Sequence, residues 1–181
     1  EGFATVVALP LTTREAIALA RSQMAAVLDA PAPVLLFLDR LALLDTAVIE
    51  SDVPDTRTRL TRVVVPIEAN LPENLRMERV TLNAGVSFLV IRQVLPKPAV
   101  LDAVRASIAA APPWKRWLAW KGEAVVSVAI PRDSRPLEVP RLFNFLPMDE
   151  RAVSPMAGHI DAPFFADIDR RSIKPDLPLN K

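Results

Sequence analysis

Basic side chains near the end of the chain form its best candidate for phosphate chemistry. Arg170 and Arg171 are adjacent, and Lys174 follows three residues later. A guanidinium group donates two parallel hydrogen bonds to phosphate or carboxylate oxygens, so two neighbouring arginines suit an anionic ligand. The alternative is an ion pair with Asp167 or Asp169, which lie just before them. The residue types leave both interpretations open.

A histidine and several carboxylates precede the arginines and offer a second kind of chemistry. His159 and Asp161 are two residues apart, as are Asp167 and Asp169. Imidazole and carboxylate groups bind divalent metals and act as acid and base, so a metal-dependent hydrolase is one interpretation. Solvated strand ends and a hydrogen-bonded histidine are the other, because such pairs often occur by chance. A Ser-His-Asp triad with Ser154 would lack the G-x-S-x-G turn around its serine.

The composition excludes several other classes of site. The 181 residues include 18 prolines, 4 widely separated glycines, 1 histidine and no cysteine. Dinucleotide turns and P-loops need clustered glycines, whose backbone N–H groups close around a phosphate, so neither is present. A thiolate nucleophile, a disulfide scaffold, a cysteine metal site and a multi-histidine metal cage are excluded as well.

Charge and hydropathy point to an ordinary globular segment. The formal net charge of +1 gives no bulk attraction to nucleic acid or to an anionic membrane. No apolar run is long enough to span a bilayer and no signal-peptide pattern is present, so a cytoplasmic setting is the default expectation. Residues 51–92 hold six arginines and five acids, a local excess of one, which favours a solvated sheet face over a phosphate-binding surface.

Three tryptophans among basic residues offer a nucleic-acid interpretation. Trp114, Trp117 and Trp120 lie beside lysines and an arginine, and such a mixture can stack on single-stranded nucleic acid. At helical spacing, however, Trp114 and Trp117 share a face with Leu118. Packing in a core or against another domain is therefore favoured.

Hydrophobic periodicity predicts two main helices separated by strands. Thr12 and Glu15 form a capping box that begins the first helix, and the prolines of 30–33 end it. Pro98 lies near the first turn of the second helix, where its missing N–H costs nothing. This mixed order favours an α+β fold, with two main helices packed on a mixed sheet.

Runs of apolar and alternating residues predict the strands. We interpret 34–38 and 43–50 as a hairpin and 51–56 as a loop, and we place Arg57, Arg59 and Arg62 on the polar face of the next strand. A second hairpin is expected around Asn83 to Gly85. The expected strands cover 3–9, 34–38, 43–50, 57–67, 77–82, 86–95, 124–130, 142–146 and 160–168.

Three phrases in the last part of the chain resemble a known family. They are Leu142-Phe-Asn-Phe-Leu-Pro-Met148, Gly158-His-Ile-Asp-Ala-Pro-Phe-Phe165 and Asp169-Arg-Arg171. Together they resemble bacterial sacsin-like ATPases of the GHKL superfamily, named for gyrase, the ninety-kilodalton heat-shock chaperone, histidine kinases and MutL. Sacsin has a related F-x-F-L-P, a small-residue and aromatic strand, and an N-R-R whose asparagine is replaced here by Asp169. The resemblance covers about 140–181 and is weaker over 1–50.

The resemblance implies a division of the chain and places the nucleotide upstream of it. In the family, an E-x-x-x-N helix and a D-x-G-x-G loop bind magnesium and ATP, and neither motif occurs in this sequence. Residues 1–30 would be the last strand of the ATP-binding domain and its following helix. Residues 31–181 would be a middle, transducer-like α+β region, incomplete at its C-terminus. ATP and magnesium are thus expected in the full-length protein, with none for this segment alone, which is not expected to be active.

The resemblance also implies roles for the basic residues. In the relatives, a basic residue of the second domain reaches the γ-phosphate and couples nucleotide state to domain closure and dimerisation. Arg170 or Arg171 matches that catalytic role. Asp176-Leu-Pro-Leu-Asn180 resembles a phrase of the chaperone's middle domain whose catalytic arginine lies three residues further on, so the two matches compete. Lys174 and Asn180 are phosphate or loop candidates, and His159, Asp161 and Asp169 are further candidates.

The expected partners follow from the same interpretation. They are the upstream ATP-binding domain in cis, a second copy in a homodimer, and protein clients, with no nucleic acid or membrane. A non-catalytic protein-interaction module is the alternative function, based on the tryptophans and on a mean hydropathy of +0.24.

Overall fold

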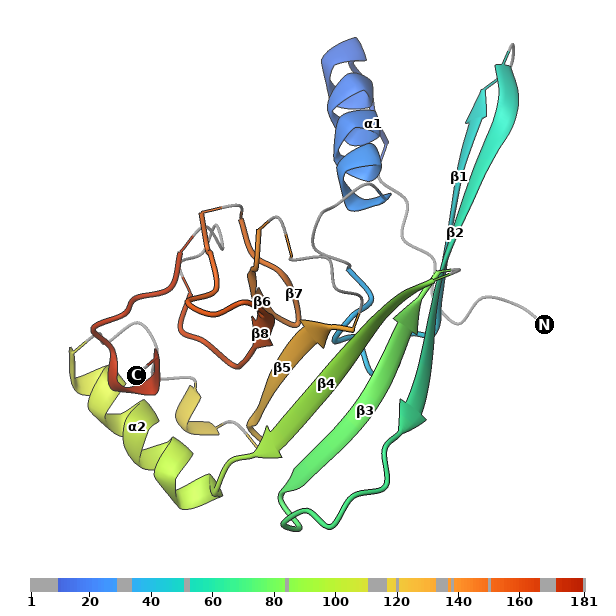
Figure 1. Cartoon of the computed structure of the whole chain (residues 1–181). Helices are drawn as coiled ribbons and strands as arrows, with labels where there is room; N and C mark the ends of the chain where they lie inside the picture. The colour runs from blue at the N-terminus through green and yellow to red at the C-terminus, as the bar shows by residue number, and fades with distance from the viewer. Residues whose placement is uncertain are drawn as a thin grey trace. The chain divides into compact units, whose positions relative to one another are not determined.

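The computed structural model describes residues 10–28, 34–50, 53–83, 85–110, 117–119, 121–132, 137, 139–149, 151–166 and 172–180. The chain separates into two compact units, Glu1–Ala30 and Pro31–Lys181. The first contains helix α1 (Arg14–Leu28), and the second contains a mixed, mostly antiparallel sheet and helix α2 (Lys97–Ala110) (Figure 1). The expected α+β class, with a mixed sheet and two helices, is confirmed. The strand predicted over 3–9 lies outside the described residues.

The sheet has the strand order β1-β2-β3-β4-β5-β8-β6-β7. The seven strands from β2 to β7 form its body, and β1 pairs only with β2. Strands β6 and β8 are parallel, and the other neighbours are antiparallel. The strands are β1 (Leu43–Glu50), β2 (Val53–Pro66), β3 (Leu75–Leu82), β4 (Val86–Val94), β5 (Val125–Pro131), β6 (Leu142–Asn144), β7 (Leu146–Pro147) and β8 (His159–Asp161).

The strand registers place alternate residues on two faces of the sheet, because successive side chains of a strand point in opposite directions. On the face that we call the core face, Val80 pairs with Phe88, and Val90 pairs with Ala129, which pairs with His159. These five side chains are at most 2% exposed. The other face, which we call the outer face, is mostly aliphatic and partly exposed, and it also carries Arg79, Thr81 and Ser87. Its exposed residues include Val63 at 57%, Val65 at 41% and Ile130 at 37%.

Residues 34–37 form a turn that covers the core face, where the sequence had predicted a strand. Leu35, Leu36 and Phe37 are buried, and the Phe37 ring lies edge-on to Phe143 at 4.9 Å between centroids. The predicted hairpin between 34–38 and 43–50 is therefore wrong. A short apolar run is compatible with any buried segment, and here the turn packs on the sheet without joining it.

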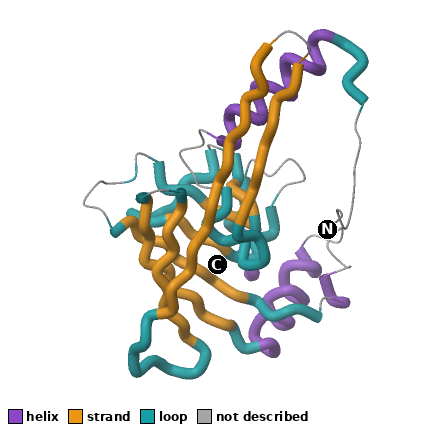
Figure 2. The backbone as a smooth tube through the Cα atoms, turned by 90° about the vertical axis from the view of Figure 1, so that its right-hand side faces the viewer, coloured by secondary structure: helices purple, strands orange, loops and turns teal. Residues whose placement is uncertain are grey.

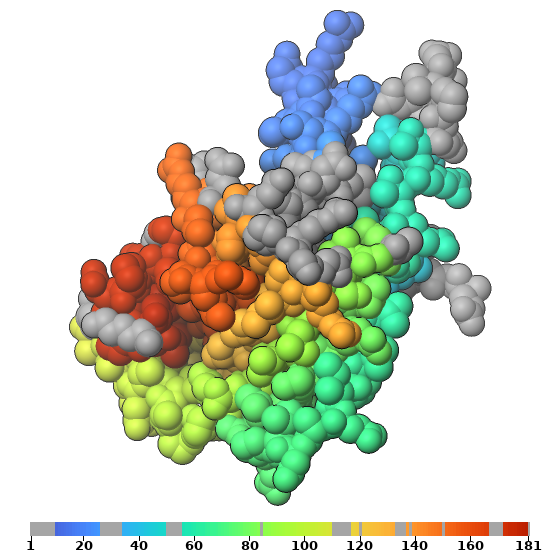
Figure 3. Space-filling model, viewed as in Figure 1, coloured from blue at the N-terminus to red at the C-terminus, as the bar shows by residue number. Residues whose placement is uncertain are grey.

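The true partner of β1 is β2, which is long enough to pair twice. Its first part pairs with β1 from Val53 to Thr61, and its second part pairs with β3 from Arg62 to Pro66. Strand β2 begins at Val53, so the predicted loop over 51–56 is too long. We call the β1–β2 ribbon the arm, because it extends beyond β3, β4 and β5 in both backbone views (Figures 1 and 2). Its residues, coloured cyan, lie at the surface of the space-filling view (Figure 3).

Helix α2 packs on the C-terminal segment of the chain. Val100 and Val104 of its apolar stripe are buried with Ala124, Phe165 and Leu177. A second cluster joins Leu142 of β6 to Met148, Ala152 and Ala166, with Ile160, Phe164 and Ile173 against it. These two clusters pack the residues on either side of 167–171 against α2 and β6.

Helix α1 begins one residue later than the capping box predicts. The backbone N–H of Ala16 donates to the Thr13 hydroxyl at 3.1 Å, so Thr13 caps the helix in place of Thr12. Among the described residues, no helix is both long and apolar enough to cross a bilayer.

The strands near the C-terminus are shorter than expected. Phe145 has φ of 65°, a left-handed conformation that separates β6 from β7 where one strand was predicted over 142–146. Strand β8 ends at Asp161, whereas 160–168 was predicted, and Pro163 follows with no N–H for a ladder. At Gly158, a Cβ atom would lie 2.9 Å from the Ala129 carbonyl oxygen, so glycine lets the chain approach β5 closely as it enters β8.

Candidate functional site

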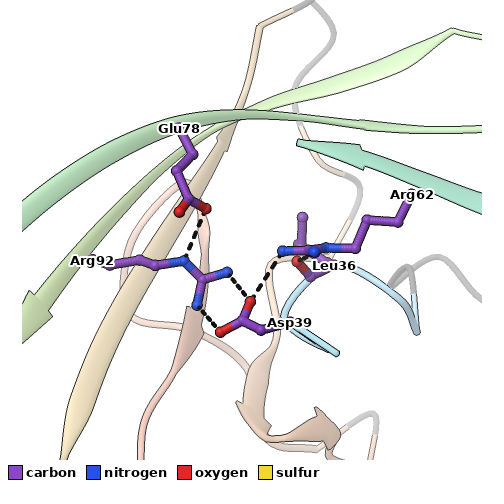
Figure 4. A network of polar contacts seen from close by, with 5 residues as sticks. All are labelled: Leu36, Asp39, Arg62, Glu78 and Arg92. Atoms are coloured by element: carbon purple, nitrogen blue, oxygen red, sulfur yellow. Dashed lines mark hydrogen bonds and ion pairs between the residues drawn. The ribbon is translucent and has the colours of Figure 1, made fainter. Parts of the chain in front are cut away.

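A network of charged side chains ties the turn over 34–39 to the sheet (Figure 4). Arg92 donates to both carboxylate oxygens of Asp39, at 2.7 and 3.0 Å, and to Glu78 at 3.1 Å. Arg62 donates to the same Asp39 at 3.0 Å and to the Leu36 carbonyl at 3.3 Å. One carboxylate therefore holds two arginines that come from different strands.

The arginines of this network are buried, while the carboxylate that joins them is not. The side chains of Arg62 and Arg92 are 6% and 9% exposed, whereas that of Asp39 is 60% exposed. Burial lowers the pKa of Arg62, and the nearby charge of Asp39 opposes this shift. Without Asp39, two buried cations would share only Glu78, so the contacts of this carboxylate are expected to matter for stability.

This network was not predicted from the sequence. Arg62 was expected with Arg57 and Arg59 on one polar face, but it points to the core face, whereas Arg57 and Arg59 are exposed. The period of two along β2 carries the signal, since residues 57 and 59 differ in parity from 62. Arg92 shows the same pattern, two residues after Val90 of the core face.

A small cavity of about 130 Å³ lies beside the network. Its lining includes Asp39, Arg92, Glu123 and Asp161, with Phe37 and Phe145 as aromatic walls. Three carboxylates and one arginine that is already paired give the lining a negative formal charge. Such an environment attracts cations and repels phosphate, so it is unlike the phosphate-binding site that the sequence predicted elsewhere.

Polar residues continue from Arg92 across the core face. Arg92 pairs with Ser127 of β5, which pairs with Asp161 of β8. The Asp161 carboxylate accepts a hydrogen bond from the Phe145 N–H at 2.9 Å and so supports the left-handed residue beside it. The Ser127 hydroxyl is fully buried and has no hydrogen-bond partner in the part of the chain that the structure describes.

His159 is buried among aromatic rings rather than at a surface. It is 0% exposed, with the Phe143 ring at 5.5 Å and the Phe88 ring at 5.9 Å between centroids. Its Nδ1 accepts a hydrogen bond from the Arg141 N–H at 3.1 Å, and its Nε2 has no partner among the described residues. Burial, with a smaller contribution from the charge of Arg141, lowers the pKa of His159 to about 4. The imidazole is therefore neutral at physiological pH.

The acid–base candidates that the sequence grouped each form a hydrogen bond with a different backbone N–H. The Ser154 hydroxyl accepts from the Met156 N–H at 3.3 Å, while His159 and Asp161 bind backbone groups of other segments. Asp167 and Asp169 lie outside the described residues, as do Trp114 and Trp120. Within the described ranges, no three histidine, aspartate or glutamate side chains are close enough to hold a metal ion.

The two catalytic candidates, Arg170 and Arg171, also lie outside the described residues, but the chain on either side of them is well defined. Ala166 and Ile173 form an antiparallel bridge, and the Lys174 N–H donates to the Phe165 carbonyl at 3.3 Å. Lys174 is itself an exposed residue. The segment with both arginines therefore starts and ends at one place in the fold.

The Asn180 carboxamide forms hydrogen bonds with the chain on both sides of residues 167–171. Its Oδ1 accepts from the Phe165 N–H at 2.8 Å, and its Nδ2 donates to the carbonyls of Phe165 and Lys174, each at 2.9 Å. Asn180 ends the 3-10 helix η2 (Pro178–Asn180), whose Leu179 N–H donates to the Ser107 hydroxyl of α2 at 3.0 Å. We call the paired Phe165, Ala166, Ile173, Lys174 and Asn180 the loop base.

The tryptophan that the structure describes, Trp117, is partly buried against the core. Trp117 lies edge-on to Phe165, with 4.9 Å between ring centroids, and packs against the cluster of α2. Residues 117–119 form a 3-10 turn. Trp117 thus supports the loop base and does not form an exposed patch.

Comparisons with known proteins add no assignment. No protein-family model, no curated protein and no solved structure matches this chain.

Proposed function

We propose that this chain is part of a chaperone-like GHKL ATPase and couples nucleotide state to domain closure by supplying a basic residue to the γ-phosphate. Arg170 or Arg171 carries that role. The proposal begins with the resemblance of 140–181 and with the absence of every nucleotide-pocket motif from the sequence. Phosphoryl transfer needs positive charge near the γ-phosphate in the transition state, often from another domain.

The loop base is the structural observation that supports this proposal most directly. A cation that reports domain closure must be held by a fixed support, because its position decides when it meets the phosphate. Three hydrogen bonds from Asn180 fasten the chain on both sides of 167–171, and Phe165 below them is 0% exposed. Asn180, at the end of the D-L-P-L-N phrase, therefore holds together the residues on both sides of the segment with the two arginines.

The test uses the longer protein that the proposal implies, with the sequence upstream of this chain. Arg170→Ala and Arg171→Ala are made singly, and ATP turnover and ATP affinity are measured. One of the two variants is expected to lower turnover by about tenfold or more with ATP binding retained. Arg105→Ala is the matched control, because Arg105 forms an exposed pair with Asp102 on α2.

Two results would remove the proposal. Unchanged turnover in both variants, with ATP still bound, would end the phosphate-sensing role. An upstream sequence without E-x-x-x-N and D-x-G-x-G motifs would end the family assignment. This chain by itself is expected neither to bind ATP tightly nor to hydrolyse it.

A protein-interaction module is the second candidate function, and the outer face of the sheet favours it. Val63, Val65 and Ile130 expose aliphatic side chains on strands of the body. The tryptophan basis for this alternative is weaker, because Trp117 packs its ring against the cluster of α2. Replacing Val63 and Val65 with threonine should leave the fold intact and weaken client binding, as measured by pull-down with purified candidate partners.

A further inference from the structure

The outer edge of β1 has hydrogen-bonding groups that no strand of the described chain uses. In the sheet order, β1 is the terminal strand and its only neighbour is β2. The Arg62 N–H donates to the Ala42 carbonyl at 2.8 Å, so residues 42 and 62 form a hydrogen-bonded pair. Such pairs alternate along an antiparallel ladder. Residues 44, 46 and 48 therefore bond to β2, while Leu43, Asp45 and Ala47 direct their N–H and C=O groups outward.

The neighbouring strand confirms this direction. Thr61, the partner of Leu43, bonds away from β1, since its N–H donates to the Asn83 side chain and its carbonyl accepts from the Asn83 N–H, both at 3.0 Å. The pair 43–61 is therefore of the non-hydrogen-bonded kind, and the outward groups of β1 belong to its odd-numbered residues.

The edge of β1 has few of the usual protections against strand pairing. Edge strands are normally short, carry charges or proline, or contain a bulge. Strand β1 has eight residues without lysine or proline, and its irregularity lies near its end, between Val48 and Glu50. Its Leu43 and Ile49 are 43% and 71% exposed. Asp45 is held by Arg59 through two hydrogen bonds of 2.7 and 2.9 Å, and this pairing lowers the pKa of Asp45. The opposite edge strand, β7, has two residues and contains Pro147.

We propose that β1 pairs with β1 of a second copy of this chain, antiparallel and in a register centred on Thr46. Because only odd-numbered residues direct hydrogen-bonding groups outward, the register must set odd residues opposite odd residues. Centring on Thr46 sets Asp45 opposite Ala47 with both hydrogen-bonded, and sets Leu44 opposite Val48. Thr46 then meets its own copy, a pairing that hydroxyl side chains favour across strands.

The neighbouring registers that keep this hydrogen bonding are worse. Centring on Asp45 sets two carboxylates directly opposite each other, which destabilises an antiparallel pair. Centring on Ala47 extends the pairing of Asp45 and Leu44 into the irregular end of β1, between Val48 and Glu50. Pairing of β1 with the other edge is limited by the two residues of β7. The second copy is therefore the partner that this edge fits.

Pairing would also stabilise the arm. A two-stranded ribbon is only marginally stable in water, whereas the pair would form a four-stranded ribbon with the order β2-β1-β1-β2. The interface is isologous, since the same edge serves both copies and closes the assembly at a dimer.

Cysteine substitutions on the full 181-residue chain test the register, because the chain contains no other cysteine. In the proposed pair, the two Thr46 residues form a non-hydrogen-bonded pair with Cα atoms about 4.5 Å apart, which a disulfide can bridge. Thr46→Cys is therefore expected to give a disulfide-linked dimer under mild oxidation. Leu44→Cys and Val48→Cys are controls, since each would lie about 13 Å from its own copy along the strand. Equal cross-linking of the three variants would overturn the register.

Proline substitution tests the pairing itself. Ala47→Pro removes an N–H that points outward and no hydrogen bond to β2, so the arm should remain intact. Sedimentation equilibrium should show a reversible dimer of the unmodified chain, and dissociation that is at least tenfold easier for Ala47→Pro. Ala47→Ser keeps the N–H and should match the unmodified chain. A monomer at every concentration up to about 100 μM, or equal association of the proline variant, would overturn the proposal.

Discussion

Asp39 shows how one residue decides whether two others can be buried. Arg62 and Arg92 occupy positions of the core face, where uncompensated charges are costly, and Asp39 brings a carboxylate to both from a turn that is distant in sequence. The same carboxylate fixes the turn on the sheet. Although the Asp39 side chain is exposed, it is therefore needed for the burial of two arginines on the core face.

Replacing Asp39 tests this role. Asp39→Ala is expected to lower the free energy of unfolding by about 3 kcal/mol, at the low end for a broken buried pair because water reaches this carboxylate. Asp102→Ala is the control, since it also removes a carboxylate paired with an arginine, but one on α2 whose side chain is 65% exposed. That control should change little. Urea denaturation at pH 7 measures both, and equal effects would show that burial of the arginines is unimportant.

His159 makes a separate prediction about pH. Its pKa is about 4 in the folded chain and 6.5 as the ordinary value, so the unfolded chain binds more protons between these pH values. Stability from the neutral imidazole is thus complete above pH 6.5 and is lost as the pH falls to about 4. The loss should reach about 3 kcal/mol.

The chain offers a clean measurement of this titration, because it has one histidine. Proton NMR should show the imidazole resonance of the folded chain unchanged from pH 7 to about 5. In His159→Asn, an amide oxygen can still accept from the Arg141 N–H, and the difference in urea midpoint between pH 7 and pH 5 should shrink. An imidazole that titrates near 6.5 in the folded chain would contradict the buried environment.

At the scale of elements, the loop base depends on the hydrogen bonds of one side chain. In Asn180→Asp, a carboxylate oxygen replaces the Nδ2 donor and faces the carbonyls of Phe165 and Lys174. Losing both bonds and setting acceptors against acceptors should cost about 2 kcal/mol of unfolding free energy. Asn74→Asp is the matched control, because its Nδ2 makes one exposed contact of 3.5 Å with the Val94 carbonyl. Thermal melts compare the two, and equal losses would show that Asn180 fastens nothing of consequence.

Elements with strong local signals were predictable from the sequence. The predicted hairpin around Asn83 is confirmed. It was predictable because alternating strands flank a residue that readily takes positive φ, here 47°. Helix α2 is also confirmed. Its local signals were a proline in the first turn and an apolar stripe at helical spacing. The turn over 34–37 was not predictable, since its burial comes from contacts with Phe143 and Arg62, which are far away in sequence.

At the scale of the whole molecule, the sequence indicated some residues of the candidate sites but not the contacts between them. The resemblance of the D-L-P-L-N phrase drew attention to Asn180, but its three hydrogen bonds come from tertiary contacts that no spacing rule gives. The charged network was missed because its members come from a turn and three strands, and nothing local links Asp39 to Arg92. Only the parity of Arg62 and Arg92 carried a signal, and it indicates burial without naming the partner.

The unbroken length of β2 sets a distance in the proposed dimer. Thr58, which pairs with Thr46 at the twofold axis, lies four residues before Arg62, where β2 enters the body of the sheet. Four residues of strand measure about 13 Å, so the two bodies would begin about 26 Å apart along the ribbon. That interval exceeds the 10–12 Å diameter of a helix with its side chains. The arm would thus act as a spacer that holds two sheets at a fixed separation, with room for another structural layer between them.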